Sequence, residues 1–254
     1  MGFVFIQGLI MSLFLKMETF VYKNFIVPLQ GKHTFDFVSE HYQKGNRVLD
    51  FGCGIGSNSK LFEPEDYIGV EVDESRVGSA RLKYPESQFE QIPFISSKDD
   101  KMPFDDNSFD IIFISLCLHH IDSSTCKLLF REFKRILNKE GKILGIEPCI
   151  LPNKYFSNVF MNVIDAGDYI LTIEEYKKMY SSESYDIDHI DIVTTYGYHL
   201  WQYNAKPNEL NTNSYVGGMT KYRKLIRPVH LTTLYGKWAI LFYLLYLITV
   251  PVFN

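Results

Sequence analysis

Short apolar runs alternate with amphipathic stretches between residues 33 and 203. The stronger apolar runs are almost continuous, as expected for strands that are covered on both faces of a sheet. Five strands are predicted: Arg47–Phe51, Tyr67–Val72, Phe89–Ile92, Phe109–Leu116 and Lys142–Glu147. The amphipathic stretches predict four helices: Phe35–Tyr42, Ser57–Phe62, Glu74–Lys83 and Ser123–Leu137, the last capped by Asp122 or Ser123. This order predicts an α/β fold with a doubly wound, mostly parallel sheet.

The pattern changes after Glu147. Two helical segments, Tyr155–Val163 and Ile173–Tyr180, precede two strand-like runs, Ile187–Thr194 and Tyr196–Tyr203. About one residue separates the two runs. A crossover helix needs many more residues, so the last two strands are expected to pair antiparallel.

Both ends of the chain are apolar. Residues 3–15 read FVFIQGLIMSLFL, with no Lys or Arg before them and no small-residue cleavage site after them. Three interpretations stay open for this segment: an apolar helix on the domain or a membrane, a secretion signal, or residues upstream of a true start at Met11 or Met17.

The C-terminal segment combines a basic stretch with an apolar one. No Asp or Glu follows Glu209, and the basic residues after it sum to +5. Residues 238–253 (WAILFYLLYLITVPVF) carry no charge, but a bilayer-spanning helix needs about 20 apolar residues. We expect peripheral membrane contact through 221–253; a buried helix that completes the core or a dimer contact is the alternative. The oligomeric state stays open.

A polar connector at 204–220 is the best boundary candidate. The expected division is an apolar segment at 1–31, a ligand-binding domain at 32–204, and a basic connector with an apolar helix at 205–254.

Composition excludes several classes of protein. Hydrophobic residues make up 46% of the chain and charged residues 22%, which excludes disorder as the main state. The net charge is −4, so the residues before the basic tail sum to about −9, which argues against a nucleic-acid surface. The four cysteines form no CxxC pair, so we expect no zinc knuckle and no thioredoxin-like site, and the sequence predicts no metal ligands. We also expect no disulfide framework and a reducing cytoplasmic compartment.

The strongest motif is Val48-Leu-Asp-Phe-Gly-Cys-Gly-Ile-Gly-Ser57, in which a strand leads into three alternating glycines. Glycines there let the backbone turn sharply and approach a ligand at the carboxyl end of the sheet. Neither GxGxxG frame of a dinucleotide site fits, and no GxxxxGK[ST] is present. Asp50, two residues before the first glycine, would repel a pyrophosphate but suits an ammonium or sulfonium charge. Glu71, at the end of the next strand, is expected to bind ribose hydroxyls.

Residues from about Lys32 to Tyr203 resemble class I S-adenosylmethionine-dependent methyltransferases, particularly the group that includes quinone and sterol methyltransferases. Five motifs carry the resemblance, in order: Leu49-Asp-Phe-Gly-Cys-Gly-Ile-Gly56, Gly69-Val-Glu71, Met102-Pro-Phe-Asp-Asp-Asn-Ser-Phe-Asp110, Leu118-His-His-Ile121 and Arg135-Ile-Leu-Asn-Lys-Glu-Gly-Lys-Ile143. The family usually has Asp where this chain has Glu71, and Gly where it has Glu140. The resemblance implies a seven-stranded sheet with an antiparallel last pair, and S-adenosyl-L-methionine as cofactor.

The resemblance also implies a role for each matching residue. Gly52, Gly54 and Gly56 would lie against the methionine and ribose portion of the cofactor. Asp50 would orient the methionine ammonium, directly or through water, and Glu71 would hold the ribose hydroxyls.

Three further positions follow from the same resemblance. Asp99 would meet the adenine amino group, although many relatives carry the acid where this chain has Lys98, and Asp100 competes. Ser115 and Leu116 would flank the sulfonium.

Two histidines follow the fourth predicted strand. An oxygen acceptor has to lose a proton, and imidazole titrates near neutral pH, so His119 or His120 is a candidate base. Adjacent residues that leave a strand point to opposite sides, so at most one should reach the site. The alternative is that one packs inside and the other bonds to a loop.

The acceptor is expected to be a small molecule. Asp165–Tyr176 resembles an insert of bacterial relatives that forms part of the acceptor wall, and Tyr169, Tyr176, His199 and Trp201 are candidates for an aromatic lining. A basic, apolar tail on the inner face of a membrane would favour a lipid-soluble acceptor. Two other functions stay open: a binding or regulatory protein without transfer activity, and a nicotinamide-dependent oxidoreductase.

Overall fold

The computed structural model describes residues 27–165, 167–195 and 198–208 of the chain. The predicted apolar helices at the two ends and the basic residues after 220 lie outside these residues. The chain divides into two units, Met1–His41 and Tyr42–Asn254. The first unit contributes helix α2 (Val27–His41), which confirms and lengthens the helix predicted before the first strand. No helix among the described residues has the length and apolar character that a bilayer crossing requires.

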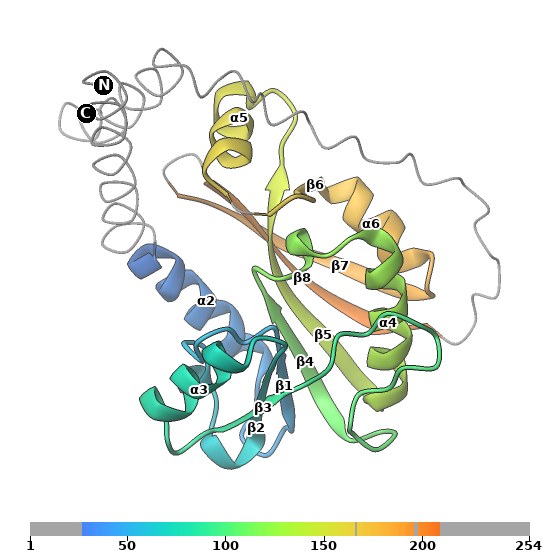
Figure 1. The fold of residues 1–254 in the computed structure, drawn as a ribbon. Helices are drawn as coiled ribbons and strands as arrows, with labels where there is room; N and C mark the ends of the chain where they lie inside the picture. Colours follow the sequence, from blue (N-terminus) through green and yellow to red (C-terminus); the bar gives the residue numbers. More distant parts are fainter. Residues whose placement is uncertain (1–26, 166, 196–197, 209–254) are drawn as a thin grey trace, which may run out of the picture. The chain divides into compact units, whose positions relative to one another are not determined.

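The second unit is built on one sheet (Figure 1). Its strands are β1 (Val48–Phe51), β2 (Tyr67–Glu71), β3 (Gln88–Gln91), β4 (Phe109–Ser115), β5 (Leu137–Ile150), β6 (Leu171–Thr172), β7 (Tyr185–Thr195) and β8 (Tyr198–Pro207). Within the described residues the order is β3-β2-β1-β4-β5-β8-β7. Strands β1 to β5 pair parallel, whereas β8 pairs antiparallel with β5 and β7. The predicted mostly parallel, seven-stranded sheet is confirmed, with the two-residue β6 added beside β5.

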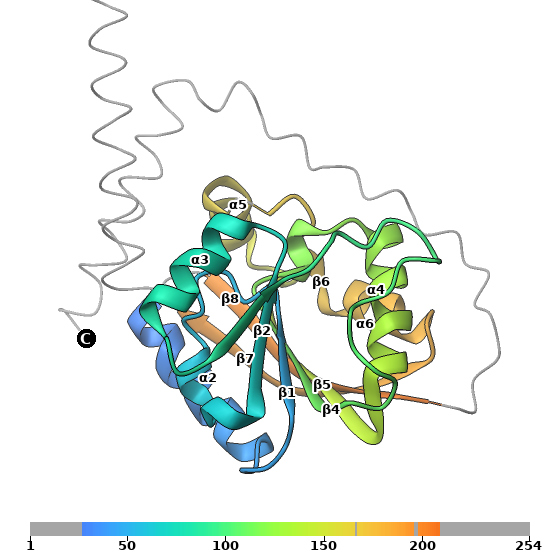
Figure 2. The ribbon, with the colours of Figure 1, turned by 60° about the horizontal axis from the view of Figure 1, so that its bottom comes forward.

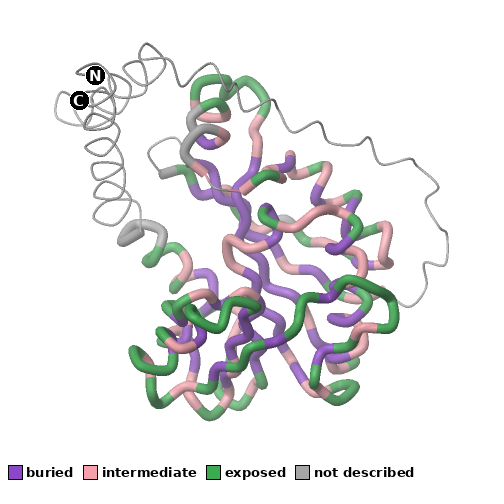
Figure 3. The backbone as a smooth tube through the Cα atoms, viewed as in Figure 1, coloured by how far each residue is buried: buried purple, intermediate pink, exposed green. Residues whose placement is uncertain are grey.

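Helices cover both faces of this sheet. Helix α3 (Glu74–Lys83) lies on one side, whereas α4 (Ser123–Ile136) and α6 (Ile173–Ser181) lie together on the other (Figures 1 and 2). Helix α5 (Tyr155–Ile164) lies beside β8. The buried residues follow the central strands (Figure 3). Ile111, Ile112 and Ile114 of β4 are at most 1% exposed, as a strand covered on both faces requires.

The helices begin where local chemistry places them. Asp122 accepts backbone hydrogen bonds from Ser124 and Thr125 and so caps α4, as predicted. Thr172 and Glu175 form a reciprocal capping box at the start of α6. These caps satisfy amide groups that a helix leaves unpaired in its first turn.

The helix predicted at Ser57–Phe62 is wrong. The chain forms a 3₁₀ helix at Ser59–Leu61 and a second at Pro64–Asp66. Only seven residues separate Gly56 from Pro64, and proline cannot donate to a continuing helix. A helix of fewer than two turns is marginal, so the crossover from β1 to β2 uses two tight turns instead.

Two strands extend beyond their predicted limits. Strand β5 runs from Leu137 to Ile150, so it contains the whole predicted strand Lys142–Glu147. Strand β8 ends at Pro207, three residues after the boundary expected at 204. Its pairing with both β5 and β7 supplies backbone partners that a hydropathy pattern does not reveal.

Candidate functional site

The glycine loop leaves the carboxyl end of β1 in a left-handed conformation. The backbone φ angles of Gly52, Gly54 and Gly56 are 73°, 57° and 79°. Residues other than glycine rarely adopt such positive values. A Cβ atom at Gly52 would lie 2.3 Å from the Cys117 sulfur, and one at Gly56 would lie 2.7 Å from the Phe89 ring. A Cβ at Gly54 would meet nothing within 4 Å. The loop therefore needs glycine for its backbone, and space remains beside Gly54.

Glu71 holds this loop from the end of β2. Its Oε2 accepts a hydrogen bond from the amide of Gly54 at 3.1 Å, and its Oε1 accepts one from the amide of Val72 at 2.8 Å. The Glu71 side chain is largely buried. Because β1 and β2 pair parallel, their carboxyl ends meet at one edge of the sheet, as the sequence predicts.

A cavity of about 420 Å³ opens at this edge. The residues that line it come from the ends of β1 and β2 and from the segments that follow β1, β2, β3 and β4: Phe51, Gly52, Val70, Glu71, Val72, Asp73, Arg76, Ile92, Pro93, Phe94, Ile95, Leu116, Cys117, His120, Ile121, Thr125 and Leu129. Most are apolar, with a few charged groups, which is typical of small-molecule sites of about 300–1,000 Å³. The structure thus brings together four predicted site residues: Gly52, Glu71, Leu116 and His120.

Asp50 does not line the cavity. Its carboxylate is 1% exposed and accepts a hydrogen bond from the Tyr67 hydroxyl at 2.7 Å. Burial raises the pKa of Asp50 to about 7, and the nearby Glu71 acts in the same direction, whereas the hydrogen bonds from Tyr67 and Asn58 oppose the rise. Near neutral pH the side chain therefore exchanges readily between its neutral and ionised forms.

Gly54 and Gly56 also lie outside the cavity lining, and so do Asp99 and Ser115. Asp99 is exposed in the loop after β3, and its amide bonds to the Ser97 hydroxyl. Its competitor Asp100 accepts hydrogen bonds from Ser96 and Ser97, so it organises the same loop. Ser115 is half-buried at the end of β4, one residue before the cavity wall at Leu116. Their cofactor roles stay predictions.

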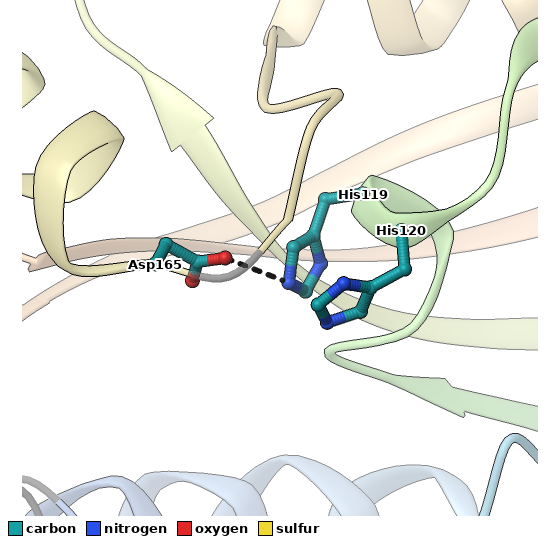
Figure 4. A group of neighbouring side chains, drawn as sticks. All are labelled: His119, His120 and Asp165. Carbon is teal, nitrogen blue, oxygen red and sulfur yellow. Dashed lines mark ion pairs between the residues drawn. The ribbon is translucent and has the colours of Figure 1, made fainter. Parts of the chain in front are cut away.

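The two histidines do not point to opposite sides, which corrects the expectation from strand geometry. They lie in a 3₁₀ helix, Leu118–His120, in which alternation no longer applies, and their ring centroids are 4.1 Å apart (Figure 4). His119 is 2% exposed, whereas His120 is exposed and lines the cavity. Only one of the two reaches the cavity, as expected.

His119 lies between two carboxylates that sequence reasoning did not assign. Its Nδ1 is 2.7 Å from Glu147 Oε2, and its Nε2 is 3.3 Å from Asp165 Oδ1. Burial alone would lower the pKa of His119, but the hydrogen bonds to Asp165 and Glu147 outweigh it and raise the pKa to about 9. His119 is thus a paired imidazolium near neutral pH and is not available as a base.

Glu147 organises the turn that carries both histidines. It is fully buried, and its Oε1 accepts hydrogen bonds from the amides of Cys117 and Leu118 at 2.8 and 2.7 Å. The sequence signal for such a role is an acid at the end of an apolar strand, LGIE. Because β4 and β5 pair parallel, that acid meets the segment leaving β4.

The aromatic residues expected in an acceptor wall do not line this cavity. Tyr176 and Trp201 are fully buried in the core, where Trp201 stacks on Tyr203. His199 is 1% exposed and bonds to Thr194. The amide of Tyr169 bonds to the His119 carbonyl at 2.9 Å, so the predicted insert contacts the histidine turn through its backbone.

Residues 49–145 match a family model described as a methyltransferase domain. An uncharacterized methyltransferase of Bacillus subtilis, YcgJ, is 33% identical over 104 residues, which are 40% of each chain. A sterol 24-C-methyltransferase of Gibberella zeae is 30% identical over 128 residues, which cover 46% of this chain and 33% of the relative. The chain therefore spans two fifths or less of these curated relatives.

Solved structures share the fold at low sequence identity. The crystal structure of Bacillus YcgJ aligns with a TM-score of 0.57 and 18% identity, covering 70% of this chain and 99% of that one. The geranyl diphosphate C-methyltransferase of Streptomyces coelicolor, in complex with Mg²⁺, geranyl-S-thiolodiphosphate and S-adenosyl-L-homocysteine, aligns with a TM-score of 0.51 and 14% identity. It covers 68% of this chain and 75% of that one.

Proposed function

Because residues 49–145 belong to the methyltransferase-domain family, we propose that this protein transfers a methyl group from S-adenosyl-L-methionine to a small, apolar or lipid-linked acceptor. The observation that carries the proposal is the hydrogen bond between the Gly54 amide and Glu71, at the edge of a cavity of about 420 Å³. It joins a bend that contains three glycines to a carboxylate that can accept ribose hydroxyls.

The residues present fit this cofactor. The open space at Gly54 leaves room for a ligand against the loop backbone. Glu71 already accepts hydrogen bonds from the amides of Gly54, Val72 and Asp73, so about one of its roughly four acceptor sites is left for a ribose hydroxyl. When bound, S-adenosyl-L-methionine supplies an electrophilic methyl group. The chain itself holds and aligns the reactants and excludes water with its apolar wall.

His120 is the histidine that meets the acceptor in this proposal. It lines the cavity, and its pKa is lowered, first by burial and then by the positive charge of His119. A neutral imidazole can accept a proton from an acceptor hydroxyl or coordinate a metal ion. His119, which is bonded on both ring nitrogens, positions the turn instead.

An apolar or lipid-linked acceptor is favoured by three observations. Ile92, Leu116 and Leu129 make part of the cavity wall apolar. Two similar proteins act on a sterol and on geranyl diphosphate, according to their names. The basic and apolar residues at 221–253 suit an anionic membrane surface.

Sedimentation of the full-length protein with anionic vesicles tests the membrane contact. Replacement of Lys221, Arg223, Lys224 and Arg227 by Ala should abolish it, and a wild-type protein that stays in the supernatant at low salt would contradict it.

Titration calorimetry with S-adenosyl-L-methionine and with NAD tests the cofactor. Binding of the first alone supports the proposal, whereas binding of NAD alone would favour the oxidoreductase alternative. Assays that follow radiolabelled methyl transfer to quinone precursors, isoprenoids and sterols then test the reaction. Cofactor binding without transfer to any member of the panel would favour the non-catalytic alternative.

A further inference from the structure

Three potential metal ligands converge beside the cavity. Donor atoms of His119, His120 and Asp165 all lie within 4.8 Å of one another. The histidines leave the same 3₁₀ turn, and Asp165 faces His119 from the segment after α5 (Figure 4). The cluster thus joins the end of β4 to the predicted insert, two parts of the chain that meet only in the folded protein.

Glu147 prepares one of these ligands. Its Oε2 lies 2.7 Å from His119 Nδ1, which leaves Nε2 directed at Asp165. Histidine ligands in proteins usually donate their other ring N–H to a carboxylate in this way, and the contact fixes both tautomer and ring orientation. Glu147 is held in turn by the amides of Cys117 and Leu118, so the arrangement is rigid before any ion arrives.

Asp165 is oriented as firmly. Its Oδ1 accepts the amide of Gly167 at 2.6 Å, and its Oδ2 accepts the hydroxyl of Tyr198. A Cβ atom at Gly167 would lie 2.1 Å from the His119 ring, so only glycine lets the segment approach this closely. The chain therefore brings the carboxylate to His119 through a contact that any other residue would obstruct.

The spacing suits a small divalent ion. His119 Nε2 and Asp165 Oδ1 are 3.3 Å apart, and a tetrahedral zinc ion with bonds of about 2.0–2.1 Å keeps its ligands about 3.3 Å apart. Two imidazoles and one carboxylate favour Zn²⁺ and Fe²⁺ over Mg²⁺ and Ca²⁺, which prefer all-oxygen sites. Three protein ligands also leave a coordination position open, as catalytic zinc sites do.

We propose that His119 Nε2, His120 and Asp165 bind one divalent transition-metal ion at the wall of the cavity, and that the ion replaces the proton between His119 Nε2 and Asp165, which is released to solvent. Because His120 lines the cavity, an ion bound by it would lie beside the space proposed for the acceptor. An oxygen of a hydroxyl- or carboxylate-bearing acceptor is the donor that fits there. This role for the ion rests on the proposed methyl transfer, whereas the ion site itself does not. With the ion bound, His120 acts as a ligand and not as a base.

Full-length protein freed of metal by chelation and dialysis should be titrated with Co²⁺, followed by visible absorption, and with Zn²⁺, followed by calorimetry. We expect one ion per chain and the intense absorption of a low-coordinate cobalt site. Asp165→Asn and His120→Gln should each weaken Zn²⁺ binding by tenfold or more. Asp105→Asn, which changes an exposed carboxylate outside the cluster, is the matched control and should bind as the wild type does.

Two results would overturn the proposal: no stoichiometric binding, or binding that both cluster variants retain. Either would leave His119 as a buried ion pair only. Thermal unfolding of each variant checks that it is folded, and His120 is exposed, so its replacement should not disturb the core. The same samples should be titrated with S-adenosyl-L-methionine. Cofactor binding without ion binding refutes the ion site alone, and ion binding without cofactor binding refutes the proposed function alone.

Discussion

The amide of Gly54 donates a hydrogen bond of 3.1 Å to the carboxylate of Glu71, across the two strand ends that bound the cavity. The residues are 17 positions apart in the chain. Their contact couples the shape of the glycine loop to the group proposed to bind ribose. Five predictions concern the surroundings of this pair and of the buried histidine.

Replacement of Gly52 by Ala should weaken cofactor binding by tenfold or more. The new Cβ would require an unfavourable φ of 73° and would meet the Cys117 sulfur at 2.3 Å, so the loop has to move. Calorimetric titration with S-adenosyl-L-methionine measures the loss. Gly78→Ala in α3 is the matched control. Its Cβ meets nothing within 4 Å, and alanine should stabilise that helix by about 0.5–1 kcal/mol without changing affinity. Equal affinity in the two variants would contradict the assigned role of the loop.

Glu71→Gln should lower cofactor affinity about 10–100-fold, because hydrogen bonds to a charged acceptor contribute about 1.5–3 kcal/mol. Gln has a single acceptor oxygen, which can accept from Gly54 or from Val72 but not from both, so the melting temperature should fall as well. The affinity is therefore compared at a temperature at which the variant is folded. Glu90→Gln in β3, an exposed position, should bind the cofactor normally. Unchanged affinity in Glu71→Gln would exclude Glu71 from the ribose contact.

Asp50 should make cofactor binding depend on pH. Its pKa is raised from 3.8 to about 7 by burial, so the free protein holds a proton that an ammonium group would displace. Affinity for S-adenosyl-L-methionine should therefore rise between pH 5.5 and 7.5 and level off above. The Asp50→Asn variant should bind more weakly and lose that slope. Titrations at several pH values provide the comparison, and identical slopes in both proteins would rule out Asp50 as the titrating group.

The same residue should reduce the stability of the free protein at high pH. A raised folded-state pKa gives stabilisation that is complete below pH 3.8 and is lost as the pH rises through about 7. Asp50→Asn should therefore raise the free energy of unfolding at pH 8, by about 1 kcal/mol or more, since one pKa unit corresponds to about 1.4 kcal/mol. Denaturant titration at pH 5 and pH 8 checks this, with the larger gain expected at pH 8.

Glu147→Gln should destabilise the protein by about 3–5 kcal/mol, because it leaves a buried cation without one of its two partners. Glu86→Gln, an exposed change, should stay within about 0.5 kcal/mol of the wild type. Thermal and denaturant unfolding measure both. A Glu147 variant as stable as the control would mean that His119 is held mainly by Asp165.

Local patterns were sufficient for much of the fold. Continuous apolar runs located β1, β2 and β4, and Asp122 marked the start of α4. These features depend only on residues that are close together in the chain, so they can be predicted from the sequence. The helix predicted at Ser57–Phe62 is wrong because composition alone permits a helix there. The seven residues between Gly56 and Pro64 are too few to form one.

The candidate site was predictable only in part. Gly52 and Glu71 are predicted together and both line the cavity, because the carboxyl end of a strand has a fixed place in a parallel sheet. The role of Asp99 is predicted only from its distance to a motif. The loop after β3 that carries it has no position fixed by the sheet, and Asp99 is exposed outside the cavity lining. Leu116 lines the cavity with a positive backbone φ of 55°. The sequence does not predict this conformation for a leucine.

By itself, the sequence determined the order of strands and helices, the parallel core and the glycine bend, since each depends on periodicity or on the steric freedom of single residues. Only the tertiary structure decided that Glu147, His119 and Asp165 form one buried cluster and that Asp50 is shut away from water. The physical reason is that burial and charge pairing depend on which distant segments meet. Pairing of β4 with β5 brings Glu147 to the histidine turn, and the small size of Gly167 allows Asp165 to reach it.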